Sequence, residues 1–562
     1  MLSTAVQAEP LDIERIFASP SLDGNAPRAL KVSPDGERVT FLKGKQTDYE
    51  RLDLWEYHID SGETRLLFDS NDLQSGEEVL SDEEKARRER MRLSGSGIVS
   101  YQWSADGKAL LFPLGGDVYY HKLGEKGAKQ LLDTDVFETD IKLSPKGNYI
   151  SFIRDQNLFV KHIESGKETA ITKEGGGNIK FGMAEFVAQE EMGRMTGYWW
   201  SPDESFIAFT KVDESPVEVI SRSEIYADDI KTIEQKYPKA GTNNVLVELA
   251  IQNINNGARR WVDLGEDKDI YLARGKWMPN SETFTYQWQT RDQQTLELRA
   301  YNVPTEKQEV LLSETSNTWV NLHNDLYFLS DSDQFIWASE RDGFKHLYLY
   351  ENNGKLVRQL TQGDWVSLNG GDISRITNEG AYHSVSFSKD ASIFIDRFST
   401  INSPAQVSLN DASGKRITWL EENKVEEGHP LYPYMDTWTK PEFGDITTKD
   451  GATLKYRIYK PENLEKKHPV IVYLYGGPHA QVVTNSWAGN RGLLMQHWVD
   501  KGYVVFTLDN RGSNYRGKAF EDPIYKKMGF VEVDDQVAGV EFLRTLPYVD
   551  AKRIGVHGHS YG

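Results

Sequence analysis

The end of the chain holds the residues whose types and spacing most clearly predict chemistry. Gly-x-Ser-x-Gly directly after a strand predicts a sharp strand-to-helix turn that exposes a serine hydroxyl. The preceding residues, 553–556, are a short run typical of a buried strand. We therefore predict that Ser560 is a nucleophile, against the alternative that it belongs to a purely structural turn. The pattern is Gly558-His559-Ser560-Tyr561-Gly562.

A serine hydroxyl becomes a good nucleophile only when a histidine, oriented by a carboxylate, takes its proton. His557 and His559 flank Ser560 but are too close in sequence to reach its hydroxyl in that geometry. We expect His479 to be an ordinary loop residue. In folds with this turn, the acid and the histidine follow the serine in chain order. We therefore expect that the chain is truncated at its C-terminus, and that it is inactive without the residues that supply both groups.

The oxyanion that forms during acyl transfer needs two hydrogen-bond donors. The backbone N–H of Tyr561, the residue after the serine, is one candidate. The second would come from residues 475–478, Tyr-Gly-Gly-Pro, where the glycines permit a close approach of the backbone. Tyr475 stands at a strand tip, so its hydroxyl could be this donor. The alternative is an ordinary strand-end tyrosine that packs on the core.

Two adjacent carboxylates, Glu190 and Glu191, form the second candidate site. On a projecting segment such a pair is usually a solvated face. If both instead face Ser560, they would bind the ammonium of a free peptide N-terminus, because –NH₃⁺ has three donors to satisfy. Binding a cation would also relieve the repulsion between the two carboxylates. Their distance from the serine would then set how many residues are released.

Length and composition limit the class of protein. A chain of 562 residues is too long for one core, and its net charge of −20 argues against nucleic acid as a partner. The absence of cysteine excludes disulfides and cysteine catalysis. No apolar run is long enough to predict a membrane-spanning helix. Residues 6–8, Val-Gln-Ala, could be the cleavage site of a truncated secretory signal, or part of an ordinary frayed terminus.

Residues 28–432 repeat one theme, in which a turn of the form Ser-Pro-Asp-Gly precedes an apolar or aromatic strand. Pro presets the backbone of such a turn, and Asp and Gly complete it. Aromatic-rich strands at this spacing predict a β-propeller, with a long array of β-sandwiches as the alternative. The copies are Ser33-Pro34-Asp35-Gly36, Ser104-Ala105-Asp106-Gly107, Ser144-Pro145-Lys146-Gly147, Ser201-Pro202-Asp203, Met278-Pro279-Asn280 and Ser388-Lys389-Asp390.

Two segments interrupt this pattern. Residues 81–92 predict a polar, projecting helix with Ser81 as its N-cap and Glu84 in the capping-box position. Residues 186–197, which include the glutamate pair, predict a second short helical insert.

From residue 437 the pattern changes to alternating strands and helices. Residues 470–475 and 503–508 are continuous apolar runs that suit strands covered on both faces, and amphipathic stretches at 493–500 and 531–546 come between and after them. This predicts a parallel sheet. We expect residues 1–27 to pack on a catalytic domain, residues 28–432 to form a propeller that controls substrate access, and residues 437–562 to form the first part of the catalytic domain.

These motifs together resemble the dipeptidyl peptidase IV branch of the prolyl oligopeptidase family, over nearly the whole chain. The resemblance implies an eight-bladed β-propeller on an α/β-hydrolase domain. The segments that carry it are Glu190-Glu191 with Gly197-Tyr198-Trp199-Trp200-Ser201-Pro202, Tyr475-Gly476-Gly477-Pro478, Leu508-Asp509-Asn510-Arg511-Gly512-Ser513 and Gly558-His559-Ser560-Tyr561-Gly562.

The resemblance also implies an activity. A member of this branch is a serine exopeptidase that releases N-terminal dipeptides, with Pro or Ala second, through an acyl-enzyme. It would need no metal or organic cofactor, act on peptides with a free N-terminus, and form a homodimer. The suspected signal remnant at residues 6–8 predicts a periplasmic or secreted protein, with the cytoplasm as the alternative location. Two other activities stay open: an endopeptidase or acylaminoacyl-peptidase of the same family, and a non-catalytic propeller that binds a partner.

Roles carry over by motif. Ser560 would be the nucleophile and Tyr475 the oxyanion donor, while Tyr561 would give its N–H to the oxyanion and its ring to the pocket for the second residue. Glu190 and Glu191 would hold the substrate ammonium. An arginine of the helix at 81–92 would hold substrate carbonyl oxygens; we expect Arg92, with Arg90 and Arg88 as alternatives. The elbow departs from the family in having His559 where tryptophan is common.

Overall fold

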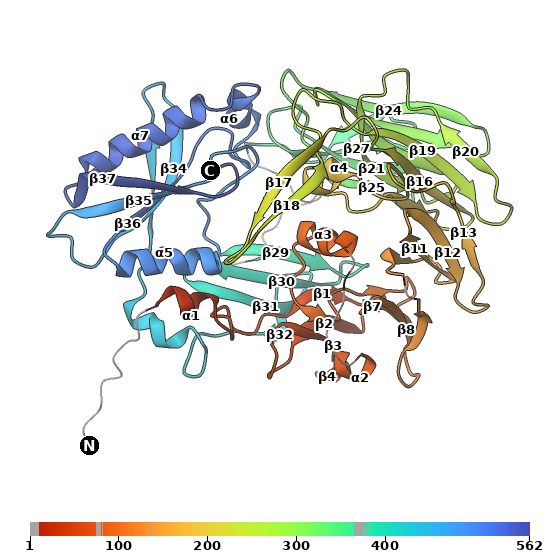
Figure 1. The fold of residues 1–562 in the computed structure, drawn as a ribbon, viewed down its shortest axis with the longest axis horizontal. Coiled ribbons are helices and arrows are strands. Elements are labelled where there is room, and N and C mark those ends of the chain that lie inside the picture. The colour runs from red at the N-terminus through yellow and green to blue at the C-terminus, as the bar shows by residue number, and fades with distance from the viewer. Residues whose placement is uncertain (1–10, 75–79, 81, 135, 365–375, 378–379) are drawn as a thin grey trace.

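The computed structural model describes residues 11–74, 80, 82–134, 136–364, 376–377 and 380–562. They form a ring of antiparallel sheets beside an α/β layer, which is drawn in blue in Figure 1. The predicted β-propeller is confirmed. The ring also argues against an array of sandwiches, because Phe41 of the first sheet packs with Ile395 and Leu409 of the last.

The ring consists of seven sheets whose strands follow one another in chain order. The first sheet contains β1 (Arg28–Val32), β2 (Arg38–Gly44), β3 (Arg51–His58) and β4 (Thr64–Phe68), with the short β5 (Ser96–Gly97) beside β3. The second contains β6 (Gln102–Trp103), β7 (Ala109–Leu114), β8 (Asp117–Lys122) and β9 (Lys129–Leu132), and the third contains β10 (Thr139–Leu143), β11 (Tyr149–Arg154), β12 (Asn157–His162) and β13 (Glu168–Ala170). The fourth contains β14 (Ile179–Phe181), β16 (Phe206–Asp213), β19 (Leu246–Asn253) and β20 (Arg259–Val262), with β15 (Tyr198–Trp200) beside β16. The other three are β21 (Ile270–Trp277), β22 (Thr283–Thr290), β23 (Thr295–Asn302) and β24 (Lys307–Thr315); β25 (Leu326–Phe328), β26 (Gln334–Ser339), β27 (His346–Glu351) and β28 (Leu356–Gln359); and β29 (Tyr382–Phe387), β30 (Ile393–Thr400), β31 (Ser403–Asp411) and β32 (Arg416–Glu421).

The serine of the repeated turn has a common structural role in five of these sheets. Its side-chain oxygen accepts a hydrogen bond from the backbone N–H five residues later, which joins the end of the first strand to the start of the second. The five bonds, with donor–acceptor distances of 2.8 to 3.2 Å, run from Arg38 to Ser33, Ala109 to Ser104, Tyr149 to Ser144, Phe206 to Ser201 and Ile393 to Ser388.

The prediction of eight blades is wrong for the described chain, which has seven. The number came from the family resemblance, and the strands do not provide an eighth sheet. Between β28 and β29 only residues 360–381 intervene, whereas a blade takes roughly 40 to 50 residues. Within the described residues, no apolar cluster joins the sixth and seventh sheets, and the β29 side chains of Tyr382, Val385 and Phe387 stay exposed.

Both helical inserts are present but shorter than predicted. The first is α3 (Asp82–Arg90); its expected cap, Ser81, lies outside the described residues. The second is α4 (Phe186–Glu190), and the chain turns at Gly193, whose φ of +63° is a left-handed conformation that glycine adopts without strain. Another short helix, α2 (Ser70–Leu73), comes before α3 in the chain.

The α/β layer is a sheet of five strands in the order β33-β34-β36-β35-β37, with β36 and β37 parallel to β35 on either side of it. Every residue of β36 is buried, as its continuous apolar sequence predicts. The strands are β33 (Glu442–Thr447), β34 (Thr453–Tyr459), β35 (His468–Leu474), β36 (Val504–Asp509) and β37 (Val549–Gly558). The helical segments around them are η1 (Tyr432–Thr437), α5 (Asn490–Asp500), α6 (Lys518–Glu521), η2 (Asp522–Ile524) and α7 (Val531–Thr545).

The described N-terminal segment lies against this layer. Helix α1 (Ile13–Phe17) packs its Ile16 with Leu493 of α5, and the backbone oxygen of Leu11 is 2.6 Å from Nδ1 of His497. Figure 1 shows α1 directly beneath α5. None of the helices in the described ranges is both long and apolar enough to cross a membrane.

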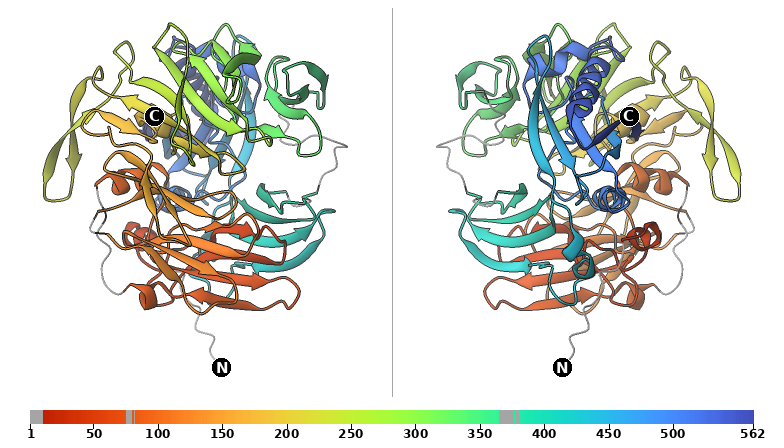
Figure 2. Two further views of the ribbon diagram at one scale, coloured as in Figure 1. Left: turned by 90° about the vertical axis from the view of Figure 1, so that its right-hand side faces the viewer. Right: turned by 90° about the vertical axis from the view of Figure 1, so that its left-hand side faces the viewer.

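A separate hairpin, β17 (Val219–Ile225) paired with β18 (Ile230–Lys236), projects from the fourth sheet away from the body of the molecule (Figure 2).

Candidate active site

Ser560 lies at the end of β37, and the backbone there is strained. Its φ is +60°, a left-handed conformation that non-glycine residues adopt uncommonly. Such outliers persist where the surrounding structure imposes them, and they cluster at functional sites. The side chain is exposed rather than packed in the core. The conformation is the one that the predicted strand-to-turn nucleophile requires.

Both glycines of the motif are needed for this turn. A Cβ on Gly558 would lie 2.1 Å from the carbonyl carbon of Gly562, and a Cβ on Gly562 would lie 2.4 Å from the backbone oxygen of Leu474. The chain therefore doubles back on itself and touches the end of β35. Any larger residue at either position would push Ser560 out of place.

The parallel pairing of β37 with β35 brings the two predicted oxyanion donors together. Gly558 pairs with Leu474, so Tyr475, the next residue, lies beside the start of the turn that carries Ser560. The rings of Tyr475 and Tyr561 have centroids 6.2 Å apart. Both rings lie over Gly477, where an added Cβ would be 2.7 Å from Cγ of Tyr561 and 3.0 Å from Cε1 of Tyr475. No described residue hydrogen-bonds the Tyr475 hydroxyl, which leaves this donor available.

The rings of His557 and His479 pack against aromatic side chains. The His557 ring packs between Tyr473 of β35 and Trp498 of α5, with centroid distances of 5.7 and 5.2 Å. The ring of His479 meets that of Trp319, in the segment before the sixth sheet, at 5.7 Å.

The glutamate pair sits at the end of α4, and a buried ion pair holds this segment in place. Nη2 of Arg194 donates to Oε2 of Glu185 at 2.9 Å, and both side chains are almost fully buried. Because these two residues flank the helix and the turn after it, they close the segment into a loop with Glu190 and Glu191 at its exposed tip.

One arginine of α3 reaches the pair. Nε of Arg90 is 3.3 Å from Oε1 of Glu190, and its Nη1 donates to Oε1 of the neighbouring Gln189 at 2.5 Å. Arg88 instead pairs with Glu84 of its own helix at 3.1 Å. Arg92, our expected residue, lines a different cavity of about 490 Å³ with Arg28 and Ser384. Packing of α3 on α4 thus places Arg90, and not Arg92, beside the glutamates.

Glu191 opens onto a cavity between the propeller and the α/β layer. The cavity has a volume of about 460 Å³, and Ser560 is not among the described residues that line it. Its wall includes Asn321, Glu340 and Lys345 from the propeller, and His479, Tyr515 and Glu521 from the α/β layer. Glu191 therefore faces space shared with the layer that carries the serine.

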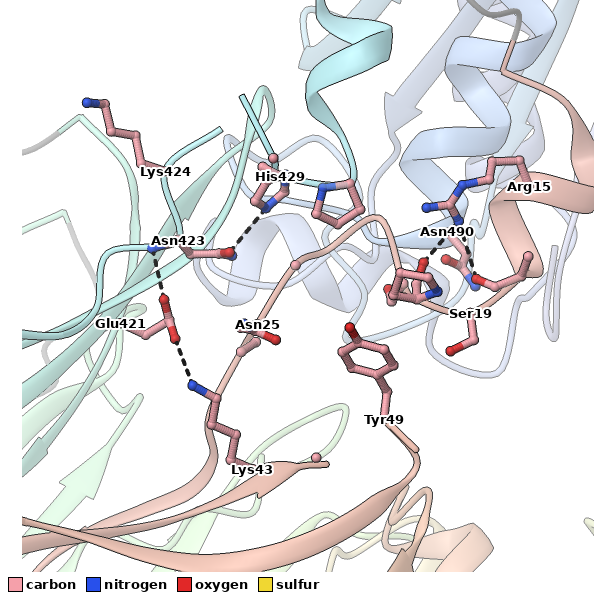
Figure 3. A pocket seen from close by; sticks show the side chains of 18 of the residues that line it. Arg15, Ser19, Asn25, Lys43, Tyr49, Glu421, Asn423, Lys424, His429 and Asn490 are labelled. Carbon is pink, nitrogen blue, oxygen red and sulfur yellow. Dashed lines mark hydrogen bonds and ion pairs between the residues drawn. The ribbon is translucent and has the colours of Figure 1, made fainter. Parts of the chain in front are cut away.

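A larger cavity lies elsewhere. Figure 3 shows this space of about 1090 Å³ between the N-terminal segment, the first sheet and the chain after β32. Lys43 and Glu421 face each other across it at 3.6 Å, and burial lowers the pKa of His429, whose Nε2 is 3.1 Å from Oδ1 of Asn423. Neither the serine turn nor the glutamate pair lines it, so size alone does not identify the site.

Comparisons with known proteins match both the ring of sheets and the α/β layer. A sequence model of the dipeptidyl peptidase IV N-terminal region matches residues 104–368, and one of the prolyl oligopeptidase family matches residues 491–562. The chain belongs to the prolyl oligopeptidase family, in its dipeptidyl peptidase IV type. As in other members of that family, the α/β part is a hydrolase domain, of which this chain contains a portion.

Individual relatives extend this family assignment. Human dipeptidyl peptidase 8 is 28% identical over 86% of this chain and 68% of its own length, and the Aspergillus flavus protein named as dipeptidyl peptidase 4 is 25% identical over 75% of the chain and 61% of its length. Among solved structures, Porphyromonas gingivalis dipeptidyl peptidase 4 superposes with a TM-score of 0.83 at 25% identity, covering 98% of this chain and 81% of that one.

Proposed function

We propose that this protein is a serine exopeptidase that releases N-terminal dipeptides, with Pro or Ala second, through an acyl-enzyme. The observation that carries the proposal is the position of Glu190 and Glu191. They are fixed beside Arg90 on a loop that opens onto the cavity between the two domains. An exopeptidase needs such a charged end-stop, because only a terminal ammonium can bind there.

The hydrolase side supplies the acyl-transfer chemistry. The Ser560 hydroxyl attacks the carbonyl carbon of the substrate's second residue, and its proton passes to a histidine base. The Tyr475 hydroxyl and the Tyr561 N–H donate to the oxygen as it becomes an oxyanion. The leaving amine then takes the proton, and water hydrolyses the ester to free the dipeptide and the serine. No residue of this chain is assigned as the histidine or the carboxylate of the triad.

The propeller side supplies recognition. Glu190 and Glu191 accept hydrogen bonds from the substrate ammonium, and Arg90 balances part of their charge. We assign Arg90, rather than Arg92, to the substrate's carbonyl oxygens, since of these two arginines it is Arg90 that contacts Glu190 in the described part of the chain. The Tyr561 ring forms one wall of the pocket for the second residue. The preference for Pro or Ala in this pocket rests on the family resemblance.

We further propose a homodimer and a periplasmic or secreted location, with the cytoplasm as the alternative. An isolated two-stranded hairpin is marginally stable alone. The β17–β18 hairpin nevertheless exposes Val219, Ile225 and Ile230, which a second copy would cover. Sedimentation of the wild type and of Ile225→Asp tests the dimer: a fall in the sedimenting mass of the variant towards that of one chain supports it.

N-terminal sequencing of the exported protein tests the location.

The glutamate pair provides the decisive experiment, in the complete gene product. Glu190→Ala with Glu191→Ala should lower kcat/KM for a free-amine Ala-Pro chromogenic substrate by roughly 100-fold, which is the effect of losing two charge-assisted hydrogen bonds. The matched control is Glu426→Ala with Glu427→Ala, another adjacent and exposed pair. Unchanged cleavage by the first variant contradicts the proposal.

Blocking the substrate distinguishes the remaining activities. The wild type should leave acetyl-Ala-Pro substrates intact, because an amide has no ammonium for the glutamates to bind. Fast cleavage of the blocked substrate would instead identify an acylaminoacyl-peptidase or endopeptidase. Absence of any covalent labelling of Ser560 by a fluorophosphonate would identify a non-catalytic binding protein.

A further inference from the structure

Asn510 joins the end of β36 to the loop that carries Tyr475. It is 1% exposed, and it directly follows the last residue of β36, which lies beside β35 in the sheet. Its Nδ2 donates to the backbone oxygen of Gly476 at 2.9 Å and to that of Arg511 at 2.6 Å. Gly476 directly follows Tyr475, so this side chain holds the Gly476–Gly477 peptide group, one residue beyond the predicted oxyanion donor.

The backbone around Gly476 depends on this bond. Strand β35 ends at Leu474, so the Gly476 carbonyl has left the sheet and its pairing. Gly476 has a φ of +81°, a left-handed conformation that turns the chain sharply there. A partly buried carbonyl that has left the sheet needs another donor. The Asn510 amide supplies that donor.

A second bond sets which way the Asn510 amide points. Nε2 of Gln536, on α7, donates to Oδ1 of Asn510 at 2.9 Å. Because Oδ1 is thereby used as an acceptor, Nδ2 faces Gly476 as a donor. The orientation of the Tyr475 loop is thus linked to α7 through the side chains of Asn510 and Gln536.

The residues on either side of Asn510 anchor other points nearby. Asp509 accepts hydrogen bonds from the N–H groups of Val482 and Val483 at 2.8 and 3.2 Å, further along the Tyr475 loop. Arg511 binds the buried Asp535 of α7, with Nη2 to Oδ1 at 2.7 Å. The three consecutive residues therefore hold the loop and α7 against one strand end, and Asn510 is the one that reaches the Gly476 carbonyl.

We propose that Asn510 is a positioning residue, which aims the Tyr475 hydroxyl at the oxyanion through the Gly476 peptide. The proposal rests on the function proposed above, in which Tyr475 is an oxyanion donor. Hydrogen bonds to an oxyanion act only if the donor is placed to within a fraction of an ångström. The Tyr475 hydroxyl has no partner of its own within the described chain, so the backbone that carries it must supply this accuracy.

The test is a double-mutant cycle in the complete gene product. Asn510→Asp keeps the size of the side chain but removes the donor to Gly476. We expect kcat to fall about 10-fold or more with KM little changed, which corresponds to the loss of one buried hydrogen bond that acts in the transition state. In a Tyr475→Phe background the same change should cost less than about 2-fold, since no hydroxyl remains to be aimed. An equal loss in both backgrounds overturns the proposal.

Two further variants separate positioning from general damage. Gln536→Glu removes the donor that orients the Asn510 amide, and it should lower kcat in the same direction by a smaller factor. Asn463→Asp, in an exposed loop of the same domain, is the control and should change neither kcat nor thermal unfolding. If Asn510→Asp lowers kcat only in proportion to a loss of folded protein in far-UV circular dichroism, the positioning role is wrong.

The substrate of this cycle is p-nitrophenyl acetate, an ester without an ammonium. Its hydrolysis needs Ser560 and the oxyanion donors but not the glutamates. Ester turnover that shows the predicted coupling supports Asn510 even if dipeptide substrates are not cleaved. Dipeptide cleavage without coupling between Asn510 and Tyr475 contradicts this inference and leaves the proposed function standing.

Discussion

The two halves of the candidate site are built differently. On the hydrolase side, Ser560 has a strained backbone, its flanking glycines are closely packed, and the Tyr475 loop accepts a hydrogen bond from the buried Asn510. On the propeller side, Glu190 and Glu191 project from the tip of a five-residue helix and are exposed. One buried ion pair, Glu185 with Arg194, fixes that loop.

The function proposed above accounts for this difference. Bond making tolerates little displacement, since a shift of about 1 Å at a reacting group can cost roughly 100-fold in rate. Attraction between full charges falls off slowly with distance, so a carboxylate can hold an ammonium from several positions. In that proposal, Ser560 needs a rigid sheet end as the nucleophile, while Glu190 and Glu191 need charge and an approximate distance from the serine.

The largest effect is expected at the rigid half. Ser560→Ala in the complete gene product should lower kcat by roughly 10⁶-fold, as for other triad nucleophiles. The side chain is exposed, so thermal unfolding should barely change. Steady-state hydrolysis of a free-amine Ala-Pro substrate measures the loss. A variant that keeps more than a hundredth of the wild-type activity would show that Ser560 is not the nucleophile.

The contact between the propeller and the α/β layer should make the stability of the fold depend on pH. Nδ2 of Asn321, from the propeller, donates at 2.8 Å to Oε2 of both Glu340 and Glu521, the latter on α6. Burial, opposed by the Asn321 bond and aided by the Glu340 charge, raises the pKa of Glu521 from its ordinary 4.5 to about 7, and burial also raises the pKa of Glu340. Lys518 and Asp522 are the charged neighbours on the same segment.

A raised carboxyl pKa means that the folded protein binds a proton that the unfolded chain releases. The stability from this proton is complete below pH 4.5 and is lost as the pH rises through 7. The shift corresponds to roughly 3 kcal/mol. Urea unfolding should therefore show that the wild type loses stability between pH 5 and pH 8, and that Glu521→Gln loses about 3 kcal/mol less. Glu248→Gln, at an exposed residue, is the control. Identical pH dependence in Glu521→Gln and wild type would contradict the assignment.

A smaller effect is expected from crowding the oxyanion side. Gly477→Ala places a Cβ 2.7 Å from the Tyr561 ring and 3.0 Å from that of Tyr475. Both donors must shift, so kcat should fall roughly 30-fold, or by about 2 kcal/mol of transition-state stabilisation. Gly555→Ala is the matched control within β37, because its Cβ would meet nothing closer than 3.9 Å. Equal activity of the two variants would mean that the tyrosines are not held as described.

The smallest effect is expected on the propeller side. Arg90→Gln removes the cation beside Glu190, and it should raise KM about 10-fold with kcat nearly constant, because one charge-assisted hydrogen bond is lost. Arg92→Gln should change KM by less than about 2-fold, since surface charges away from a site contribute little. Michaelis parameters for both variants decide between the arginines. A larger rise in KM for Arg92→Gln than for Arg90→Gln would indicate that Arg92 binds the substrate, as we first expected.

Several of these features could be predicted from local sequence. The order of strands and helices after residue 437, the turn that carries Ser560, and the place of Tyr475 at the tip of the neighbouring strand all follow from apolar runs and glycine positions. The turn serines of the propeller were visible as well, since Ser-Pro-Asp-Gly has its own backbone preference.

Other features depended on contacts between distant segments. The helix predicted at 186–197 ends at Glu190, because the Glu185–Arg194 pair and Gly193 turn the chain early. The blade number taken from the resemblance failed because the chain between β28 and β29 is too short for another sheet. The role of Asn510 was missed, although a polar residue at the end of a buried parallel strand is a signal that could have indicated it.

The sequence by itself determined the local turn that exposes Ser560 and the order of the strands around it, because glycine, serine and apolar periodicity act over a few residues. Only the tertiary structure decided that Arg90 meets Glu190, that Glu191 opens on the space between the domains, and that Asn510 holds the Gly476 peptide. Those contacts join residues from separate sheets and helices. Their geometry is set by packing, which no local pattern encodes.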